Sequence, residues 1–282
     1  MKITILYDIV RWEEKALLEA GKKRGIETGL LDVRGQVFDL SSREGAYGDV
    51  ALQRATSYYR GLHAAAIIQS YGTPVVNCRE ILEITGNKAF TLLKLREHGV
   101  PVPHTYVTFD VPKALESFKS LGGRAVIKPV MGSWGRMVGL LETENSAKAV
   151  LEDRLYMDPL YQVFYLQEYV KRPPRDIRAF VVGNRVVAAI YRYQPETDWR
   201  TNTALGGRAE NCPVTGEIED IALRAASAIG EGVYGVDIME NENGMVVHEV
   251  NGTVEFKNSV PVTGVDIQGK IVEYLIDRAR EK

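Results

Sequence analysis

The chain contains two neighbouring runs rich in β-branched residues, Val233-Tyr-Gly-Val-Asp237-Ile-Met-Glu240 and Met245-Val-Val-His-Glu249-Val-Asn251, joined by Asn241-Glu-Asn-Gly244. Two such runs on either side of a glycine-bearing turn predict a β-hairpin. Apolar residues surround the two carboxylates Asp237 and Glu249, so we expect these carboxylates to be partly buried and to need partners. The alternative, that the hairpin is an acidic, solvated surface, stays open on this pattern alone.

The turn sets which residues face each other across the hairpin. A three-residue loop, Glu242-Asn243-Gly244 with Gly244 in the left-handed conformation, would place Asp237 opposite Glu249. Asn251 would then share their face, because side chains alternate along a strand. A two-residue Asn243-Gly244 turn would instead place Val250 opposite Asp237.

In the first register, three oxygen-bearing side chains converge on one spot. Asp237, Glu249 and Asn251 are hard oxygen ligands of the kind that Mg²⁺ prefers. Protein sites usually hold Mg²⁺ with one or two carboxylates and leave the other positions to water and substrate phosphates. The hairpin therefore predicts a protein that binds a nucleoside triphosphate.

The composition excludes several other classes of function. The chain has 282 residues, long enough for two or three subdomains, and carries 35 basic and 37 acidic side chains, a net charge of -2. This balance favours neither nucleic acid nor an anionic membrane as a partner. Cys78 and Cys212 form no CxxC pattern, so we expect neither a disulfide nor a zinc site. No apolar run approaches the length of a membrane span, and the start shows no signal peptide, so we expect a cytoplasmic protein.

The periodicity of the chain predicts three units. Strand and helix patterns alternate in residues 1–85, which predicts a small parallel α/β domain. This domain has no GxGxxG after its first strand, so we expect a platform rather than a cofactor site. We expect the second unit to span residues 86–165 and the third to span residues 166–282.

Two lysines of the second unit are suited to phosphate. Lys128 ends the predicted strand 124–128 and is followed by a loop with Gly132-Ser133-Trp134-Gly135-Arg136. Glycines allow a close backbone approach, and the lysine supplies a point charge. The loop lacks the GK[ST] ending of a Walker A motif, and a simple tight turn remains an alternative. Lys88, at the start of a helix over residues 87–98, is either a second phosphate ligand or a solvated surface residue.

The third unit begins with a strand over residues 164–170 whose backbone could face an adenine edge. Gly183-Asn184 then joins two strands that carry Arg178 and Arg192. We expect both arginines near one rim of the sheet, where they could clamp a transferring phosphoryl group and a carboxylate. The helix over residues 217–229 has apolar residues at helical spacing and is most simply core.

Together these motifs resemble the ATP-grasp ligases. The resemblance rests on the order of Lys88, Lys128-Pro129 with its loop, Gln167-Glu168-Tyr169-Val170, Asp176-Ile-Arg178 and the Asp237/Glu249/Asn251 hairpin. The resemblance covers most of the chain. Within the ATP-grasp ligases it is to the RimK-like branch, whose members add amino acids to carboxyl groups. The implied fold is α/β, becoming α+β in the C-terminal half: an ATP-grasp fold preceded by an N-terminal parallel α/β pre-grasp domain.

A second set of motifs is similar to the LysX/ArgX group of that branch. These motifs are Thr201-Asn-Thr-Ala204, Ala209-Glu-Asn-Cys-Pro213 and the stretch from Glu249 to Ser259. In this group the LysX form has Asn followed by Thr or Ser and joins α-aminoadipate to the carrier protein LysW. At the positions that Asn258 and Ser259 occupy in this sequence, the ArgX form has Gly-Phe, and it takes glutamate. Asn258-Ser259 matches the LysX form, so the resemblance favours α-aminoadipate, with a glutamate ligase or a bifunctional enzyme as the alternative.

The resemblance also implies a set of site residues. ATP would be held by Lys88, Lys128, Gly132, Ser133, Trp134, Gly135, Arg136, Gln167, Glu168, Tyr169, Val170, Arg178 and Asn202. The amino acid would be surrounded by Arg192, Thr203, Ala204, Phe256, Lys257, Asn258, Ser259 and Val260. Arg178 and Arg192 would act in catalysis, and Asp237, Glu249 and Asn251 would bind Mg²⁺.

The implied reaction activates the C-terminal glutamate side chain of LysW, a small acidic carrier, as an acyl phosphate. The α-amino group of α-aminoadipate then displaces phosphate, as a step of lysine biosynthesis. We also expect a homo-oligomer. Two other classes remain as alternatives: a nucleotide-binding regulatory module without turnover, and a structural protein whose hairpin carboxylates merely pair with Arg178 and Arg192.

Overall fold

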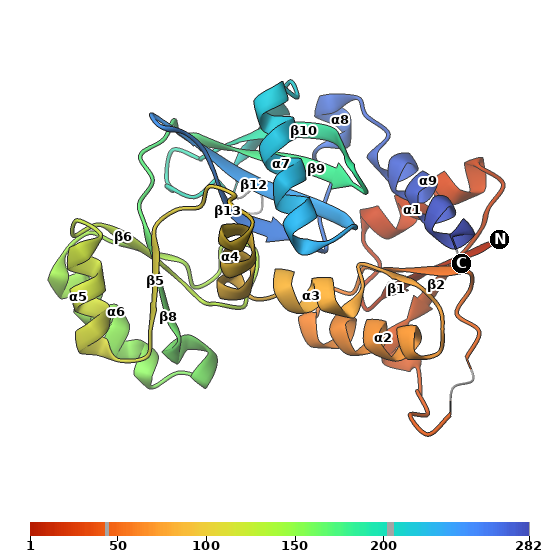
Figure 1. The fold of residues 1–282 in the computed structure, drawn as a ribbon, viewed down its shortest axis with the longest axis horizontal. Helices are drawn as coiled ribbons and strands as arrows, with labels where there is room; N and C mark the ends of the chain where they lie inside the picture. Colours follow the sequence, from red (N-terminus) through yellow and green to blue (C-terminus); the bar gives the residue numbers. More distant parts are fainter. Residues whose placement is uncertain (43–44, 202–205, 282) are drawn as a thin grey trace.

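Three β-sheets lie side by side along the long axis of the molecule (Figure 1). The computed structural model describes residues 1–42, 45–201 and 206–281. The five-stranded sheet occupies the middle of the molecule, the N-terminal sheet lies on one side of it, and the sheet of the predicted second unit lies on the other. Within the described ranges every helix is too short or too polar to span a membrane.

The N-terminal sheet is parallel throughout and has the strand order β2-β1-β3-β4, which confirms the predicted parallel α/β architecture. Its strand β3 was not predicted, because four buried residues are too few to show a period. The elements of this region are β1 (Lys2–Tyr7), α1 (Trp12–Lys23), β2 (Glu27–Asp32), the 3₁₀ turn η1 (Val33–Gly35), β3 (Val50–Gln53), α2 (Tyr58–Ser70), β4 (Val75–Val76) and α3 (Arg79–Thr85).

The second sheet is antiparallel, with the order β5-β8-β6-β7. Helices α5 and α6 cover one of its faces, and Phe118, Leu151 and Phe164 pack together between the helices and the sheet. The elements from residue 86 onward are α4 (Lys88–Glu97), β5 (Thr105–Thr108), α5 (Val111–Ser120), β6 (Ala125–Lys128), β7 (Gly139–Leu141), α6 (Glu144–Leu155), the 3₁₀ turn η2 (Pro159–Gln162) and β8 (Phe164–Glu168).

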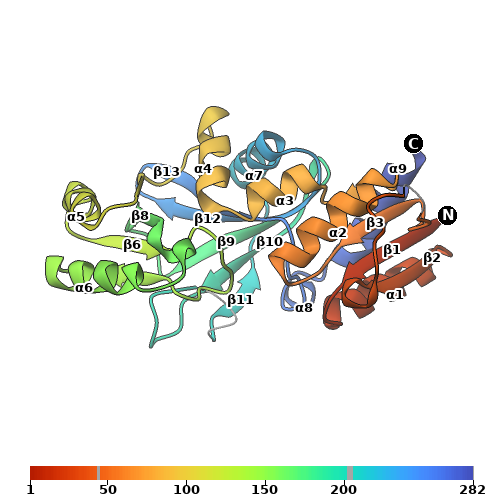
Figure 2. The same cartoon turned by 90° about the horizontal axis from the view of Figure 1, so that it is seen from below.

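The third sheet is antiparallel and has the order β11-β10-β9-β12-β13. One of its faces packs against α7, as the apolar spacing of that helix predicted, and α3 and α4 lie on the same side (Figure 2). Its elements are β9 (Arg175–Val182), β10 (Arg185–Tyr193), β11 (Arg208–Asn211), α7 (Gly216–Ile229), β12 (Val233–Asn241), β13 (Gly244–Asn251), α8 (Val260–Thr263) and α9 (Ile267–Arg280).

The β12–β13 hairpin has the predicted pairing but a different turn. Asp237 lies opposite Glu249, as expected, and Gly244 has a positive φ of 118°. The prediction of a three-residue loop is wrong, because Asn241 pairs with Gly244 across a two-residue loop. A β-bulge makes up the difference: Ile238 pairs with Val247 and Asp237 with Glu249, so His248 is the extra residue. The alternative pairing of Asp237 with Val250 is excluded.

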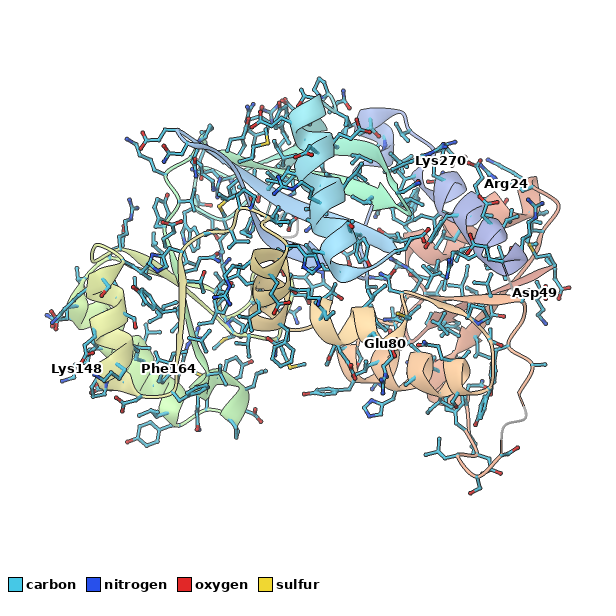
Figure 3. All side chains as sticks on the ribbon, in the orientation of Figure 1. Arg24, Asp49, Glu80, Lys148, Phe164 and Lys270 are labelled. Atoms are coloured by element: carbon cyan, nitrogen blue, oxygen red, sulfur yellow. The ribbon has the colours of Figure 1, made fainter. Side chains whose placement is uncertain are left out.

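Helix α9 packs against the N-terminal sheet. Ile267, Ile271 and Leu275 join the same apolar cluster as Ile3 and Leu17. Arg24, at the end of α1, bonds Glu273 of α9 at 2.7 Å, and Figure 3 shows Arg24 beside Lys270 of that helix. The predicted boundary at residue 165 falls inside β8, and α4 packs on the third sheet rather than the second. The three-unit division by residue number stays a prediction.

Candidate functional site

A cavity of about 280 Å³ lies against one face of the five-stranded sheet. Residues from all three sheet regions line it, and among them are two-thirds of the residues that the sequence singled out. These are Lys88, Lys128, Gly132, Ser133, Trp134, Gly135, Arg136, Gln167, Glu168, Tyr169, Val170, Arg178, Arg192, Asp237, Glu249 and Asn251. The fold therefore collects into one site residues that lie as far apart in the sequence as Lys88 and Asn251.

Strand alternation explains why the charged residues of the third sheet share one face. Val236 and Ile238 pack in the core beneath α7, so Asp237 between them points to the opposite face. Asn251 lies on that face too, because its Nδ2 donates to Asp237 Oδ2 at 3.3 Å. The predicted convergence of Asp237, Glu249 and Asn251 is thus present in the structure.

Two arginines converge on Asp237. Arg178 Nε and Nη2 each donate to one Asp237 oxygen at 2.7 Å, and Arg192 Nη2 lies 3.1 Å from Asp237 Oδ2. Arg192 also donates twice to Asp176, at 2.7 and 2.8 Å. The two arginines thus lie together, as expected, but Arg192 is not solvated, because its side chain is only 4% exposed. It lies opposite Asp176 across the β9–β10 pair, where cross-strand ion pairing allows a charge to be buried.

These ion pairs shift the proton affinities of the groups. Burial by itself raises the pKa of Asp237, but the charges of Arg178 and Arg192 outweigh it and hold the pKa below its usual value. Burial likewise opposes the charged form of Glu249, and the nearby Lys88 ammonium is the largest influence that lowers its pKa. Both hairpin carboxylates are therefore ionised at neutral pH, as a cation site requires.

The two predicted phosphate lysines approach the hairpin from the other side of the cavity. Lys88 follows Asn87, which caps α4, and its Nζ lies 2.8 Å from Gly132 O and 3.3 Å from Glu249 Oε1. Lys128 ends β6, is buried, and donates to Gln167 Oε1 at 2.7 Å. Burial lowers the pKa of Lys128 to about 8. The Lys88 ammonium thus lies beside the glycine-bearing loop that was predicted to receive phosphate, and Lys128 lines the same cavity.

The loop between β6 and β7 is fixed by hydrogen bonds to two other segments that line the cavity. Trp134 adopts a left-handed backbone with a φ of 59°, and Gly135 follows with a φ of 67°. Trp134 Nε1 donates to Glu255 Oε1 at 3.3 Å, and Arg200 Nη1 donates to Gly135 O at 2.8 Å. The conformation is compact, and the glycines bring its backbone close to Lys88.

The expected adenine segment lies at the end of β8. Gln167 and Glu168 end the strand, and Tyr169 and Val170 continue past it along the cavity. The ring of Tyr169 stacks beneath the Arg124 guanidinium at 4.0 Å. This wall of the cavity combines an aromatic ring, an apolar side chain and backbone groups, which suits a flat heterocyclic base.

The hairpin fits a magnesium ion that is shared with phosphates. No group of three His, Cys, Asp or Glu side chains suited to a metal occurs in the described part of the chain. Two carboxylates and one amide oxygen beside two lysines match the coordination in which substrate supplies the remaining oxygens. Each carboxylate oxygen has two lone pairs, so Asp237 can bind a cation while it stays paired with Arg178.

Of the residues predicted to surround the amino acid, Arg192 lines this cavity, and the others lie apart from it or outside the described residues. Phe256 is fully buried and packs edge-on against Trp12, with ring centroids 5.9 Å apart. Ser259 is buried, whereas Lys257 and Asn258 are exposed, and Val260 begins α8. None of residues 256–260 lines the cavity. Asn202, Thr203 and Ala204 lie outside the described residues.

Several lining residues were not predicted. The N-terminal domain, expected to be only a platform, contributes Arg11, Gln53 and Thr56 to the cavity wall. The bulge residue His248 and the carboxylate Asp176 also line it. Asp176 lies opposite Arg192 only because a β-bulge between Val186 and Ala188 shifts the register, so the predicted turn at Gly183-Asn184 alone would not have found this pair. The others carry no local signal, because packing between distant segments brings them to the site.

Comparison with known proteins assigns the two parts of the chain to families. A model described as the RimK-like ATP-grasp domain matches residues 85–275, and one described as the LysX preATP-grasp domain matches residues 3–84. The α-aminoadipate–LysW ligase LysX of Saccharolobus solfataricus is 38% identical over 96% of this chain and 98% of its own. The glutamate–LysW ligase ArgX of Sulfurisphaera tokodaii is 31% identical over 98% of each chain.

Among solved structures, the ATP-grasp ligase PsnB complexed with a minimal precursor, Mg and ADP superposes with a TM-score of 0.75. The two chains are 22% identical, and the superposition covers 98% of this chain and 97% of the other. The likeness establishes the fold over the full length.

Proposed function

The chain belongs to the RimK-like ATP-grasp family, and we propose that it joins the α-amino group of α-aminoadipate to the C-terminal glutamate side chain of the carrier LysW. The observation that carries this proposal is the convergence of Lys88, Lys128 and the hairpin carboxylates on one cavity. This geometry serves phosphoryl transfer to a carboxylate. The greater identity to LysX, 38% against 31% for ArgX, supports α-aminoadipate over glutamate in a step of lysine biosynthesis.

The chemistry requires an activated carboxylate, because a free carboxylate is a poor electrophile. The carrier's glutamate oxygen attacks the γ-phosphorus of ATP, the bond to ADP breaks, and an acyl phosphate forms. The amine then attacks the acyl carbon, inorganic phosphate leaves, and the nitrogen loses a proton. The first step transfers a highly charged phosphoryl group and the second expels inorganic phosphate, so catalysis rests on positioning and charge stabilisation.

The residues of the cavity divide this work by position. Lys88 and Lys128 hold the phosphates from the side of the glycine-bearing loop. Asp237, Glu249 and Asn251 hold Mg²⁺, which when bound offsets charge on the phosphates of ATP. Tyr169 and Val170 contact the base.

The two arginines stand opposite the lysines. Arg178 and Arg192 reach the same spot from β9 and β10, where they offset charge on the transferring group. Their shared pairing with Asp237 couples phosphoryl stabilisation to the metal ligand. The alternative of a structural protein predicted the pairing of Asp237 with both arginines, and that pairing is present. Family membership nevertheless makes the chain a ligase.

The decisive experiment is mass spectrometry of a LysW-type carrier after incubation with the protein, ATP, Mg²⁺ and either α-aminoadipate or glutamate. We expect a mass gain of one α-aminoadipate residue, with ADP and inorganic phosphate as products. A gain only with glutamate would reassign the enzyme to the ArgX activity. Formation of AMP and pyrophosphate would contradict the acyl-phosphate route.

A further inference from the structure

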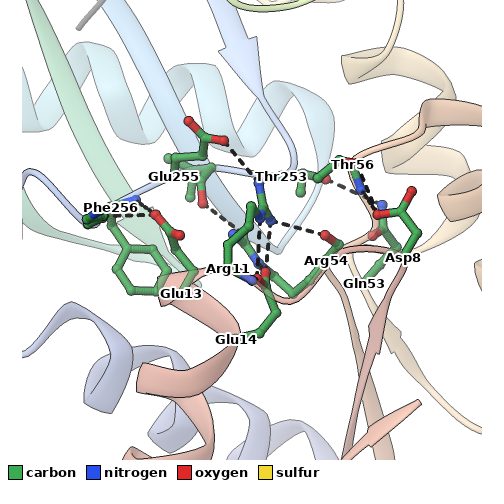
Figure 4. Close-up of polar contacts among 12 residues, drawn as sticks. Asp8, Arg11, Glu13, Glu14, Gln53, Arg54, Thr56, Thr253, Glu255 and Phe256 are labelled. Carbon is green, nitrogen blue, oxygen red and sulfur yellow. Dashed lines mark hydrogen bonds and ion pairs between the residues drawn. The ribbon is translucent and has the colours of Figure 1, made fainter. Parts of the chain in front are cut away.

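The segment between the metal hairpin and the proposed amino-acid residues is fastened to the N-terminal domain. Residues 252–257 lead from Asn251 at the end of β13 to Asn258-Ser259. The path of this short segment therefore decides where Asn258-Ser259 lies relative to the metal ligands. Figure 4 shows the charged side chains of the N-terminal domain that converge on it.

Two arginines hold the first half of the segment. Arg54, which follows β3 and is 3% exposed, donates from Nη1 to Val254 O at 2.7 Å. Arg11, which precedes α1, donates from Nη1 to Glu255 Oε1 at 3.0 Å. Gln53 adds a longer contact of 3.4 Å from its Nε2 to Thr253 Oγ1.

One carboxylate holds the second half. Glu13, buried in the first turn of α1, accepts hydrogen bonds at Oε1 from the backbone N–H groups of Phe256, at 3.2 Å, and Lys257, at 3.0 Å. An ionised acceptor shared by two consecutive amides fixes both peptide planes. From residue 253 to residue 257, every residue is therefore bound by a side chain of the N-terminal domain.

A fourth charged residue holds the arginines in place. Glu14 is fully buried and bonds Arg11 Nη2 at 2.8 Å and Arg54 Nε at 3.2 Å. Buried ion networks of this kind contribute little net stability, because the desolvation of the charges offsets their attraction. What such a network does supply is a single geometry for the groups that it binds.

We propose that this clamp of Arg11, Glu13, Glu14 and Arg54 makes the N-terminal domain a determinant of amino-acid specificity. It acts by positioning the segment that carries Asn258-Ser259. The inference rests on the proposed function, because it assumes that residues 256–260 contact the amino acid. Glu13 is its most direct positioning residue, since it alone fixes the two amides next to Asn258.

The test compares Glu13→Ala and Glu13→Gln with the parent enzyme. In Glu13→Ala we expect the ratio of kcat/KM for α-aminoadipate over glutamate to fall roughly tenfold, because a loosened segment no longer distinguishes one methylene. The KM for ATP should change by less than about twofold, because Glu13 lies outside the cavity wall and Glu255, which holds Trp134, keeps its bond to Arg11. Hydrogen exchange of residues 253–258 should accelerate, while exchange in β12 and β13 stays unchanged. Glu13→Gln, which keeps one carbonyl acceptor, should restore most of the ratio.

The exposed Glu19 on the same helix gives a matched control, and Glu19→Ala should leave every readout at the parental value. A folded Glu13→Ala that keeps the parental ratio would overturn the clamp while the proposed function stands. If Glu13→Ala does not fold, Arg11→Ala takes its place, because it removes the bond to Glu255 in the same segment. A folded Arg11→Ala with parental exchange and selectivity would overturn the clamp equally. A parent enzyme that attaches neither amino acid would remove the proposed function, and the specificity inference with it.

Discussion

Lys128 shows how burial tunes a single charge in this site. Its side chain is enclosed beside Gln167, and burial lowers its pKa from 10.5 to about 8, although the charge of Glu249 partly opposes the shift. The ammonium form is therefore less favourable in the free enzyme than in water. A phosphate placed next to it would favour that form again.

The affinity for ATP should consequently fall as the pH rises through about 8. Above this pH the free enzyme must bind a proton before Lys128 can pair with phosphate, and the affinity falls by up to about tenfold per pH unit. Calorimetric titration with ATP and Mg²⁺ between pH 7 and pH 9 checks this. In Lys128→Met we expect weak binding without this pH dependence; a variant that keeps the parental profile would contradict the assignment.

The same residue predicts the opposite trend for folding stability. The folded pKa of about 8 lies below the ordinary value of 10.5, so between these pH values the unfolded chain binds more protons than the folded chain. The free energy of unfolding should therefore rise with pH across this window as far as Lys128 contributes. Denaturant titrations of the parent and Lys128→Met isolate that contribution as the difference between their pH slopes.

Glu249 is the carboxylate whose loss should be most damaging to turnover. Glu249→Gln keeps the size of the side chain but removes the charge that a cation needs, so we expect kcat to fall by orders of magnitude while the fold persists. Glu240→Gln is the matched control, because Glu240 lies on β12 of the same hairpin and pairs with Arg175 outside the cavity wall. Near-normal turnover with unchanged Mg²⁺ dependence in Glu249→Gln would refute the metal assignment.

At the scale of elements, helix α4 places Lys88 in the site. The Asn87 side chain caps it by accepting from the N–H groups of Ala89 at 3.0 Å and Phe90 at 3.4 Å. Lys88 is the first residue of the helix, so its position depends on an intact first turn. The Asn87 cap therefore helps to fix where Lys88 lies in the cavity.

Removing this cap should weaken both stability and ATP use. We expect Asn87→Ala to cost about 1 kcal/mol of unfolding free energy. The KM for ATP should rise several-fold as the first turn frays. Asp110→Ala removes the cap of α5, which lies away from the cavity, and should produce a similar stability loss without the kinetic effect. If both variants change the KM alike, the placement of Lys88 does not depend on the α4 cap.

The hairpin also shows where sequence reasoning stops. The alternation of apolar residues predicted both strands, and the pairing of Asp237 with Glu249 was right. The predicted loop was one residue too long, and the bulge at His248 compensated for that error. A bulge leaves no periodic signal, because one extra residue in a strand looks the same as a shift in the turn.

At the scale of the whole molecule, the features that the sequence did not predict depend on packing between segments that are far apart in the chain. The parallel first sheet, the β12–β13 hairpin and the positions of Lys88 and Lys128 in the cavity follow from local patterns. The contribution of Arg11 to the cavity was missed, and so was the docking of α9 on the N-terminal sheet. An amphipathic helix shows that it has an apolar face but not which sheet will cover that face.

The overall charge bears on carrier binding. The enzyme carries a net charge of -2, so it has no global attraction for an acidic carrier, and we expect docking to use a local basic surface. We expect the KM for the carrier to rise when the salt concentration is increased, because screening shortens the reach of such contacts to about 8 Å at physiological ionic strength. Steady-state kinetics at several salt concentrations test this, with the KM for the amino acid as the internal reference. A carrier KM that is independent of salt would contradict electrostatic docking.

The return of α9 to the first sheet has a consequence for synthesis on the ribosome. Strand β1 emerges early, yet Ile3 and Leu17 share their apolar cluster with Ile271 and Leu275. A nascent chain therefore carries an uncovered apolar face while the ATP-grasp sheets are being translated, and vectorial folding of the first domain cannot finish before α9 arrives. The N and C labels lie close together in this region (Figure 1), so completing the domain also brings the first and last helices of the chain together.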